Sequence, residues 1–336
     1  MIKEVKKATF YKRFLASLID YALVFLAGLG IFVLINRGII PLGFNDSELR
    51  STQLDLKEDS FLFDIEYNES GGLKREELLS FNENNINEYN KFNEVISNYY
   101  FNYLTKENKS NRDLNIVFFK FDISTLESSI FKINDIDDPV SEFKLKETIF
   151  DVSLNKEVNL SDSTNYYKAI KNYYMDETNG VYYYAVNNFE TQNRYKEVST
   201  KLMNNINIEI TIGLVFSTFV FIGIPSLIFK HNESIIMHLF KLGYVNHKGY
   251  KINYLSKIAR AIFLTALIGS SMYAYFIPIL INVLLSYFDK EEGKSLIDIL
   301  SYEICIDIKE STIYKDEKEY IREMYNKEEK TTSIEN

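Results

Sequence analysis

The chain has 336 residues, with 38 Lys and Arg against 47 Asp and Glu, and its net charge is −9. This acidic balance is the opposite of what a nucleic-acid-binding chain carries, so we expect no nucleic acid among its partners. A single cysteine, Cys305, excludes an intrachain disulfide. The hydrophobic residues are unevenly distributed, in apolar blocks at 14–35, 210–229 and 261–288, and a long polar stretch separates the first two.

The first apolar block predicts a membrane-spanning helix. Phe14 to Ile35 is 22 residues long and carries one charge, Asp20. At ~1.5 Å per residue this run covers the ~30 Å hydrocarbon core of a bilayer. Arg13 opens the run, and Asp20 follows two turns later on the same helix face. A carboxylate near the centre of a span costs ~2.5–3.5 kcal/mol to insert, so Asp20 is a candidate functional residue.

A cleaved signal peptide is the alternative interpretation of this block. The apolar run is long for a signal peptide, Asp20 interrupts it, and no A-x-A cleavage site follows it. These features favour an uncleaved span.

The other two blocks predict further spans. Ile210 to Phe229 has twenty uncharged residues and predicts the second span. The third block, 261–288, would be roughly 42 Å long as one helix, which is longer than one span and short for two. Gly269-Ser270-Ser271 and Pro278 are candidate breaks. The block is therefore either one long kinked helix or a helical hairpin, which gives three or four spans in all.

Charge distribution predicts the orientation. Residues 1–13 hold five Lys and Arg against one Glu, and the 230–260 loop holds six against one. Residues 41–205 hold 18 Lys and Arg against 29 Asp and Glu, a net charge of −11. Because short basic segments stay in the cytoplasm, we expect a multi-pass protein of the cell membrane with a cytoplasmic N-terminus and with 41–205 outside.

The polar stretch predicts a small α+β domain. Strands are expected where apolar and polar residues alternate, at 61–67, 114–122, 148–154 and 180–186. Helices are expected at 74–104, 163–175 and 188–205, and the last should continue into the second span.

The predicted fold is thus an α-helical integral membrane protein with three hydrophobic blocks and an inserted α+β extracytoplasmic domain. Its parts in chain order are a cytoplasmic N-terminus with the first span (1–40), the extracytoplasmic domain (41–205), the second span (206–230), a basic cytoplasmic loop (231–260), the third hydrophobic block (261–288) and a charged C-terminal tail (289–336).

No catalytic motif is found in the chain. Ser-His-Asp, Cys-His, Walker and zinc signatures are all missing, so we expect no enzymatic activity and no cofactor. Three histidines, His231, His238 and His247, lie close together in the basic loop. Their spacing is not i, i+4, and neither a cysteine nor a paired carboxylate accompanies them, so no metal site is predicted.

The apolar part of the chain resembles the RDD family of bacterial integral membrane proteins, which is named for one Arg and two Asp residues. In that family the first span begins with an Arg and contains an Asp, which matches Arg13 and Asp20 in RFLASLID. The last segment contains an Asp, which matches Asp298 in SLIDILSYEICID. A basic loop with a glycine turn and then an Arg is similar to LGYVNHKGYKI followed by Arg260.

The resemblance covers 10–35 and 210–307, and leaves 41–205 as an unmatched insertion. One run departs from it, because the family has a Thr-Pro-Gly-Lys-like run after the second span, where this chain has Ser234-Ile235-Ile236-Met237. The resemblance implies a membrane protein that is often associated with transport.

Arg13, Asp20, Arg260 and Asp298 therefore form the candidate site, expected at or near the inner face. They are either a proton or cation site around Asp20, or interhelical ion pairs that fix how the spans pack. If 261–288 folds back, Asp298 returns to Arg13 and Arg260, and the runs around Ile304–Ile306 and Leu242–Val245 could pair as strands.

Two functions follow from these features. The first is a transport-related activity with Asp20 on the pathway, which requires a homo-oligomer because three or four spans are few for a carrier. The second is a membrane-anchored protein whose 41–205 domain binds an extracytoplasmic protein or ligand. In both, the lipid bilayer is a partner.

Overall fold

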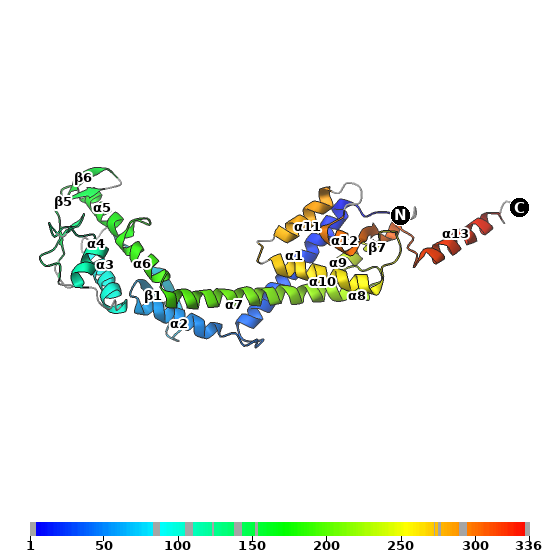
Figure 1. The fold of residues 1–336 in the computed structure, drawn as a ribbon, viewed down its shortest axis with the longest axis horizontal. Helices are drawn as coiled ribbons and strands as arrows, with labels where there is room; N and C mark the ends of the chain where they lie inside the picture. Colours follow the sequence, from blue (N-terminus) through cyan, green and yellow to red (C-terminus); the bar gives the residue numbers. More distant parts are fainter. Residues whose placement is uncertain are drawn as a thin grey trace. The chain divides into compact units, whose positions relative to one another are not determined.

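The computed structural model describes residues 5–82, 88–104, 110–122, 124–137, 143–151, 154–271, 273–274, 277–288 and 294–332. The fold in this part is mostly helical, with small antiparallel two-stranded sheets (Figure 1). The chain divides into two compact units. One of the two boundaries between them falls within helix α7. Unit 1 comprises 1–44 and 204–336, and unit 2 comprises 45–203.

Two helices in the described part are long and apolar enough to cross a bilayer. They are α1 (Phe10–Asn36) and the continuous run from α7 (Asn193–Thr218) through a π-helical turn, η2 (Phe219–Gly223), to α8 (Ile224–Ile228). As expected, the last helix of the polar stretch runs without a break into the second apolar block.

The third apolar block is divided into two helices, α10 (Tyr254–Ser271) and α11 (Ile277–Phe288). α10 ends with the Gly269-Ser270-Ser271 run, and residues 273–274, which precede α11, form a turn. α11 is apolar but has only twelve residues, which is below the ~20 that a perpendicular span needs. The third block thus contains two separate helices, which agrees with a helical hairpin better than with one kinked helix.

Short elements complete unit 1. They are α9 (Ile235–Leu239), β7 (Leu242–Asn246), α12 (Leu296–Ser301), β8 (Glu303–Asp307), the 3₁₀ turn η3 (Ile308–Glu310) and α13 (Glu317–Thr332). β7 and β8 pair antiparallel, and Tyr244 lies opposite Cys305. The predicted pairing of these two runs is thus confirmed. The N-terminal segment lies along β8, where the Ala8 N–H donates to the Cys305 carbonyl at 3.1 Å.

Helix α1 buries one face and exposes the other. Its buried residues, Arg13, Ala16, Asp20, Val24 and Gly28, recur every three or four positions and so form one stripe. Ala16 packs in a cluster with Tyr244 and Cys305, and Val24 in a cluster with residues of α7, α10 and α12. Large apolar side chains remain exposed on the rest of the helix, including Leu18, Leu26 and Leu29.

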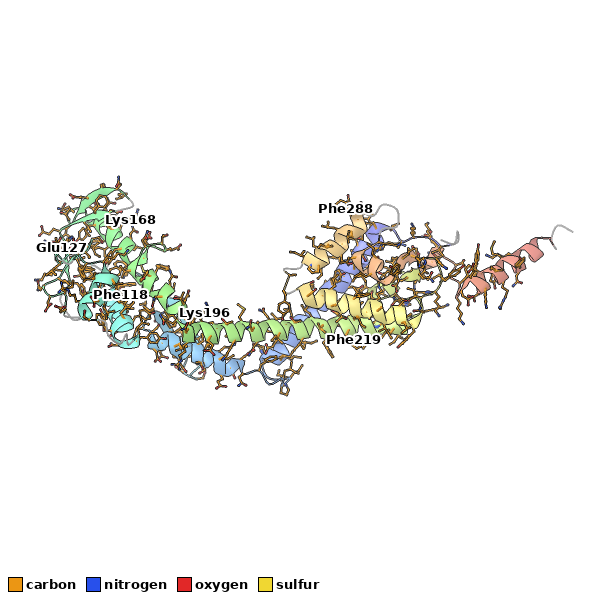
Figure 2. The ribbon with its side chains drawn as sticks, viewed as in Figure 1. Phe118, Glu127, Lys168, Lys196, Phe219 and Phe288 are labelled. Atoms are coloured by element: carbon orange, nitrogen blue, oxygen red, sulfur yellow. The ribbon has the colours of Figure 1, made fainter. Side chains whose placement is uncertain are left out.

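Among its described residues, unit 2 combines short helices with three two-stranded antiparallel sheets. Its elements are α2 (Asp46–Asp59), β1 (Phe63–Tyr67), β2 (Leu73–Leu78), α3 (Glu88–Ser97), the π-helical η1 (Asn98–Tyr103), α4 (Asn111–Phe119), β3 (Phe131–Lys132), β4 (Lys144–Leu145), β5 (Thr148–Asp151), β6 (Lys156–Asn159), α5 (Ser163–Met175) and α6 (Val181–Glu190). The core of unit 2 is rich in aromatic side chains and includes Tyr174. Phe118, labelled in Figure 2, belongs to the same core. The predicted helix at 163–175 is confirmed as α5.

Two predicted strands of unit 2 are wrong. The runs at 114–122 and 180–186 were expected as strands because apolar and polar residues alternate in them, but 114–119 lie in helix α4 and 181–186 lie in helix α6. In α6 the buried residues are Val181, Tyr182, Ala185, Val186 and Phe189, which is helical spacing. In both runs, the burial of one helix face therefore outweighs the strand propensity of the residues.

The helix expected over 74–104 is correct only from Glu88 onward. Its first residues form β2 instead, where Arg75 contacts Asp64 and Glu66 of β1 across the hairpin. Residues 83–87 of this predicted helix, and 152–153 of the predicted strand at 148–154, lie outside the described residues.

Candidate functional site

Asp298 is held at the start of α12. Ser295 is the N-cap residue, and its hydroxyl accepts the Asp298 N–H at 3.3 Å. In return the Asp298 carboxylate accepts the Ser295 N–H at 3.0 Å, which completes a capping box. The side chain is fully buried, so this local geometry fixes where the carboxylate points.

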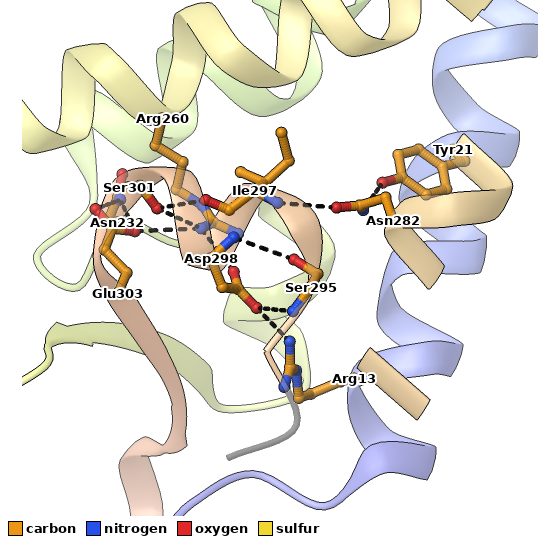
Figure 3. Close-up of polar contacts among 10 residues, drawn as sticks. All are labelled: Arg13, Tyr21, Asn232, Arg260, Asn282, Ser295, Ile297, Asp298, Ser301 and Glu303. Atoms are coloured by element: carbon orange, nitrogen blue, oxygen red, sulfur yellow. Dashed lines mark hydrogen bonds and ion pairs between the residues drawn. The ribbon is translucent and has the colours of Figure 1, made fainter. Parts of the chain in front are cut away.

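Two arginines from distant parts of the sequence meet this carboxylate (Figure 3). Arg13 Nη2 of α1 lies 2.5 Å from Asp298 Oδ2, and Arg260 Nη1 of α10 lies 2.8 Å from Oδ1. All three side chains are at most 10% exposed. The structure thus brings three of the four predicted site residues together and ties α1, α10 and α12 at one point.

A second carboxylate, Glu303, joins this cluster, and the sequence analysis missed it. Its Oε2 lies 3.2 Å from Arg260 Nη1, and the Asn232 side-chain amide donates to both of its oxygens at 3.1 and 3.2 Å. The Arg260 guanidinium also lies over the Tyr244 ring, 3.5 Å from its centroid. Arg260 is therefore shared among two carboxylates and an aromatic face.

The two carboxylates of the cluster have different proton affinities. Burial raises the pKa of Asp298, but the Arg260 and Arg13 charges outweigh it and hold that pKa below its ordinary value. Burial raises the pKa of Glu303 to about 7, and Arg260 compensates only in part. Glu303 is thus the group of the cluster that titrates near neutral pH.

Asp20 does not join the cluster. In the described part of the chain its partners are neutral donors and neither arginine pairs with it. The Ser234 hydroxyl donates to Asp20 Oδ2 at 2.5 Å, and the Ile236 N–H also donates to the carboxylate. Ser234 at the same time caps α9 by accepting the Met237 N–H at 3.0 Å. Asp20 therefore lies apart from the ion pairs of Arg13, Arg260 and Asp298.

A cavity of about 60 Å³ separates Asp20 from the arginine cluster. Its lining includes Asp20, Arg13 and Arg260, together with Ser17, Ser226 and Asn282. At ~30 Å³ per molecule of liquid water, this volume holds about two waters. This space is enough for water or a small cation.

Asn282 is a further residue that the sequence analysis missed. Its amide donates to the Tyr21 hydroxyl at 3.1 Å, and its carbonyl accepts the Ile297 N–H at 3.0 Å (Figure 3). It thereby ties α11 to α1 and to the start of α12. The signal in the sequence is a lone amide in a twelve-residue run whose other polar side chains are one serine and one tyrosine.

The remaining candidates lie outside the cluster. Among the described residues, no group of three or more His, Cys, Asp and Glu side chains could hold a metal ion. His238 stacks on Phe229, and burial lowers the pKa of His231. Cys305 is buried, which raises the pKa of its thiol to about 12.

The chain was compared with known proteins at three levels. No family model, no curated protein and no solved structure matches it. Function therefore has to be inferred from the residues themselves.

Proposed function

We propose that this chain is an integral membrane protein in which Asp20 holds a proton or a small cation. The chain resembles the RDD family in its Arg and Asp positions, and the proposal gives these positions separate roles. Asp20 is the binding group. Arg13, Arg260 and Asp298 hold the helices around it.

The exposed surface of α1 supports the membrane location. Only 22% of its most apolar window is buried, and its exposed residues include Leu26 at 70%. Exposed apolar patches of this size are costly in water and favourable in lipid. We infer that α1 and the α7–α8 run span the membrane, and that α10 and α11 form a shallower hairpin beside them.

The single observation that carries the proposal is a buried carboxylate on a water-sized cavity. Asp20 is 5% exposed, and its described partners carry no positive charge. Hydroxyls of Ser17 and Ser226 line the same cavity. Carboxylate and hydroxyl oxygens are the ligands that hard cations prefer, and a proton or cation would neutralise the buried charge.

The flux of protons and sodium into proteoliposomes tests this proposal. We expect the full chain and a variant lacking 45–203 to conduct, and Asp20→Asn to lose the flux at least tenfold. The matched control is Asp316→Asn, which removes an exposed carboxylate distant from the cavity and should conduct like the parent. Undiminished flux through a correctly inserted Asp20→Asn variant would contradict the proposal.

A second candidate function is a membrane-anchored binding protein that uses unit 2. The favouring observation is that unit 2 has its own core and a cavity larger than the one beside Asp20. On positive-inside grounds this unit would lie outside the cell. Loss of flux on deletion of 45–203, with binding retained by the full chain, would favour this candidate.

A further inference from the structure

A groove of about 570 Å³ lies in unit 1, where the α7–α8 run and α10 pack side by side (Figure 1). Its lining extends from Thr211 to Leu227 on the α7–α8 run, and from Ile258 to Ser270 on α10. At ~1.5 Å per residue the stretch from Thr211 to Leu227 is about 24 Å long. The mean cross-section of the groove is therefore about 24 Å².

This cross-section decides what kind of group the groove accepts. A helix with its side chains is ~10–12 Å wide, so it needs ~80 Å² or more. Carbon atoms in van der Waals contact lie ~3.5–4.0 Å apart, so a single hydrocarbon chain needs about 16 Å². The groove is therefore wide enough for one hydrocarbon chain and too narrow for a helix of a second copy.

The lining of the groove is apolar in its exposed chemistry. Its hydroxyl groups belong to Thr211, Thr265 and Ser270, and each donates to a backbone carbonyl of its own helix, at 2.7, 2.8 and 3.0 Å. Phe219 and Ile262 of the lining are exposed on the helices that we place in the bilayer. An occupant therefore reaches the groove from the lipid and needs no polar group within it.

A basic cluster lies at the α8 end of the groove. The Lys257 ammonium donates to the Phe229 carbonyl, which directly follows α8. Burial lowers the pKa of His231, and the charges of three nearby lysines lower it further. These lysines are Lys230, Lys251 and Lys257. Three ammonium groups are therefore gathered where the groove ends.

The positive charge of this cluster is only partly compensated. Glu233 is the one acidic residue of the 230–260 loop, and it is buried, where it accepts the His231 N–H at 2.7 Å. Lys230 and Lys251 are both exposed. On positive-inside grounds this end faces the cytoplasmic leaflet, which contains anionic lipids. Because an acyl chain gains little on leaving lipid for an apolar groove, the headgroup charge decides which lipid binds.

We propose that this groove binds an acyl chain of an anionic phospholipid. Lys230 and Lys251 contact the phosphate of the headgroup, and the apolar walls of the α7–α8 run and α10 contact the chain. The proposal rests on the membrane location proposed above and is independent of the role of Asp20. Asp20→Asn should therefore bind the lipid as the parent does, so the flux assay and the lipid-binding assay can fail separately.

Native mass spectrometry of the full chain in detergent tests the proposal. The probes are dioleoyl phosphatidylglycerol, which is anionic, and dioleoyl phosphatidylcholine, which has the same acyl chains and no net charge. We expect phosphatidylglycerol to bind at least tenfold more tightly than phosphatidylcholine. Equal affinities for the two lipids, or no bound lipid, would overturn the proposal.

Substitution of the exposed lysines locates the headgroup. Each lysine near a membrane surface contributes about fivefold to the binding of anionic lipid. Combining Lys230→Gln with Lys251→Gln should therefore weaken phosphatidylglycerol binding at least tenfold and leave phosphatidylcholine binding unchanged. The matched control combines Lys168→Gln with Lys196→Gln, two exposed lysines of unit 2 (Figure 2). Equal phosphatidylglycerol affinities of the Lys230 and Lys251 variant and the parent would overturn the proposal.

A second substitution locates the acyl chain. Ala266→Trp should fill the groove and abolish the binding of phosphatidylglycerol, because Ala266 is an exposed residue of the lining. Leu18→Trp is the control, at an exposed position of α1 that is absent from the lining. Undiminished lipid binding by a folded Ala266→Trp variant would overturn the proposal. A lipid-free dimer that Ala266→Trp dissociates would overturn it too, and would assign the groove to a second copy of the chain.

Discussion

At the scale of single residues, three buried carboxylates are distinguished by their partners. Asp298 contacts two guanidiniums, Glu303 contacts one and an amide, and Asp20 contacts a hydroxyl and a backbone N–H. The sequence indicated Asp20 through the cost of a charge in an apolar run, and Asp298 through the family resemblance. Nothing in the sequence separated their roles, because Ser234, the partner of Asp20, is 214 residues away from it, and Arg13, one partner of Asp298, is 285 residues away.

Asp298→Asn should be strongly destabilising. The substitution removes the charge that both Arg13 and Arg260 contact while the guanidiniums stay buried. Breaking a buried pair in this way costs ~3–5 kcal/mol. Unfolding by denaturant in detergent measures it. Asp307→Asn is the comparison, because its partner Lys12 is half exposed and such pairs contribute below ~1 kcal/mol. Equal losses in the two variants would contradict the shared-carboxylate role.

Glu303 should make stability fall as pH rises. Its folded pKa, about 7, lies above the ordinary value of 4.5, so the fold favours the protonated form. That contribution is complete below pH 4.5 and is lost as pH rises through 7. Glu303→Gln should therefore change the free energy of unfolding more favourably at pH 8 than at pH 5. The difference between the two pH values should be up to about 3 kcal/mol. Thermal unfolding at the two pH values tests this, and a pH-independent difference would refute it.

At the scale of elements, the long apolar helices were predictable and the short elements of unit 2 were not. Continuous apolar runs leave no alternative to a helix in a bilayer. In unit 2 the runs at α4 and α6 are rich in residues that favour strands, and only their packing selects a helix. The sequence likewise could not show where α1 and α7 cross. The structure places Gly28 and Gly213 in direct contact there.

The crossing of α1 and α7 should not tolerate a side chain. A Cβ at Gly213 would overlap the Gly28 carbonyl oxygen, so the two backbones would have to separate. We expect Gly213→Ala to lower the unfolding temperature by several degrees. Gly30→Ala in α1 is the control, because a Cβ there meets nothing within 4 Å. If both variants unfold at the same temperature as the parent, the close approach of the two backbones is contradicted.

At the scale of the whole molecule, folding back of the third apolar block brings the ends of unit 1 together. Arg260 at the start of α10 and Asp298 after α11 are in contact, and the N-terminal segment lies along β8. If residues 1–13 are cytoplasmic, as their basic charge predicts, the strand β8 and the tail after it are cytoplasmic too. The contacts between the N-terminal segment and β8 give this placement of the tail, which could not be predicted from the charges of the tail alone.

Labelling of intact cells with a membrane-impermeant maleimide tests this topology. The native thiol Cys305 is buried and should not react, so the parent chain is the control. Tyr325 in α13 and Tyr184 in α6 are both more than half exposed. We expect Tyr184→Cys to be labelled in intact cells and Tyr325→Cys only after permeabilisation. Labelling of Tyr325→Cys before permeabilisation would place the tail outside.

The central claim is that Asp20 takes up a proton or a cation inside the membrane part. Infrared difference spectroscopy of the reconstituted chain measures this directly, because protonated and ionised carboxyl groups absorb at different frequencies. A Glu303→Gln background removes a buried carboxyl group whose pKa burial raises to about 7. On changing the pH or adding sodium, we predict a carboxyl difference band that disappears when Asp20→Asn is added. A band that persists unchanged without the Asp20 carboxylate would contradict the claim.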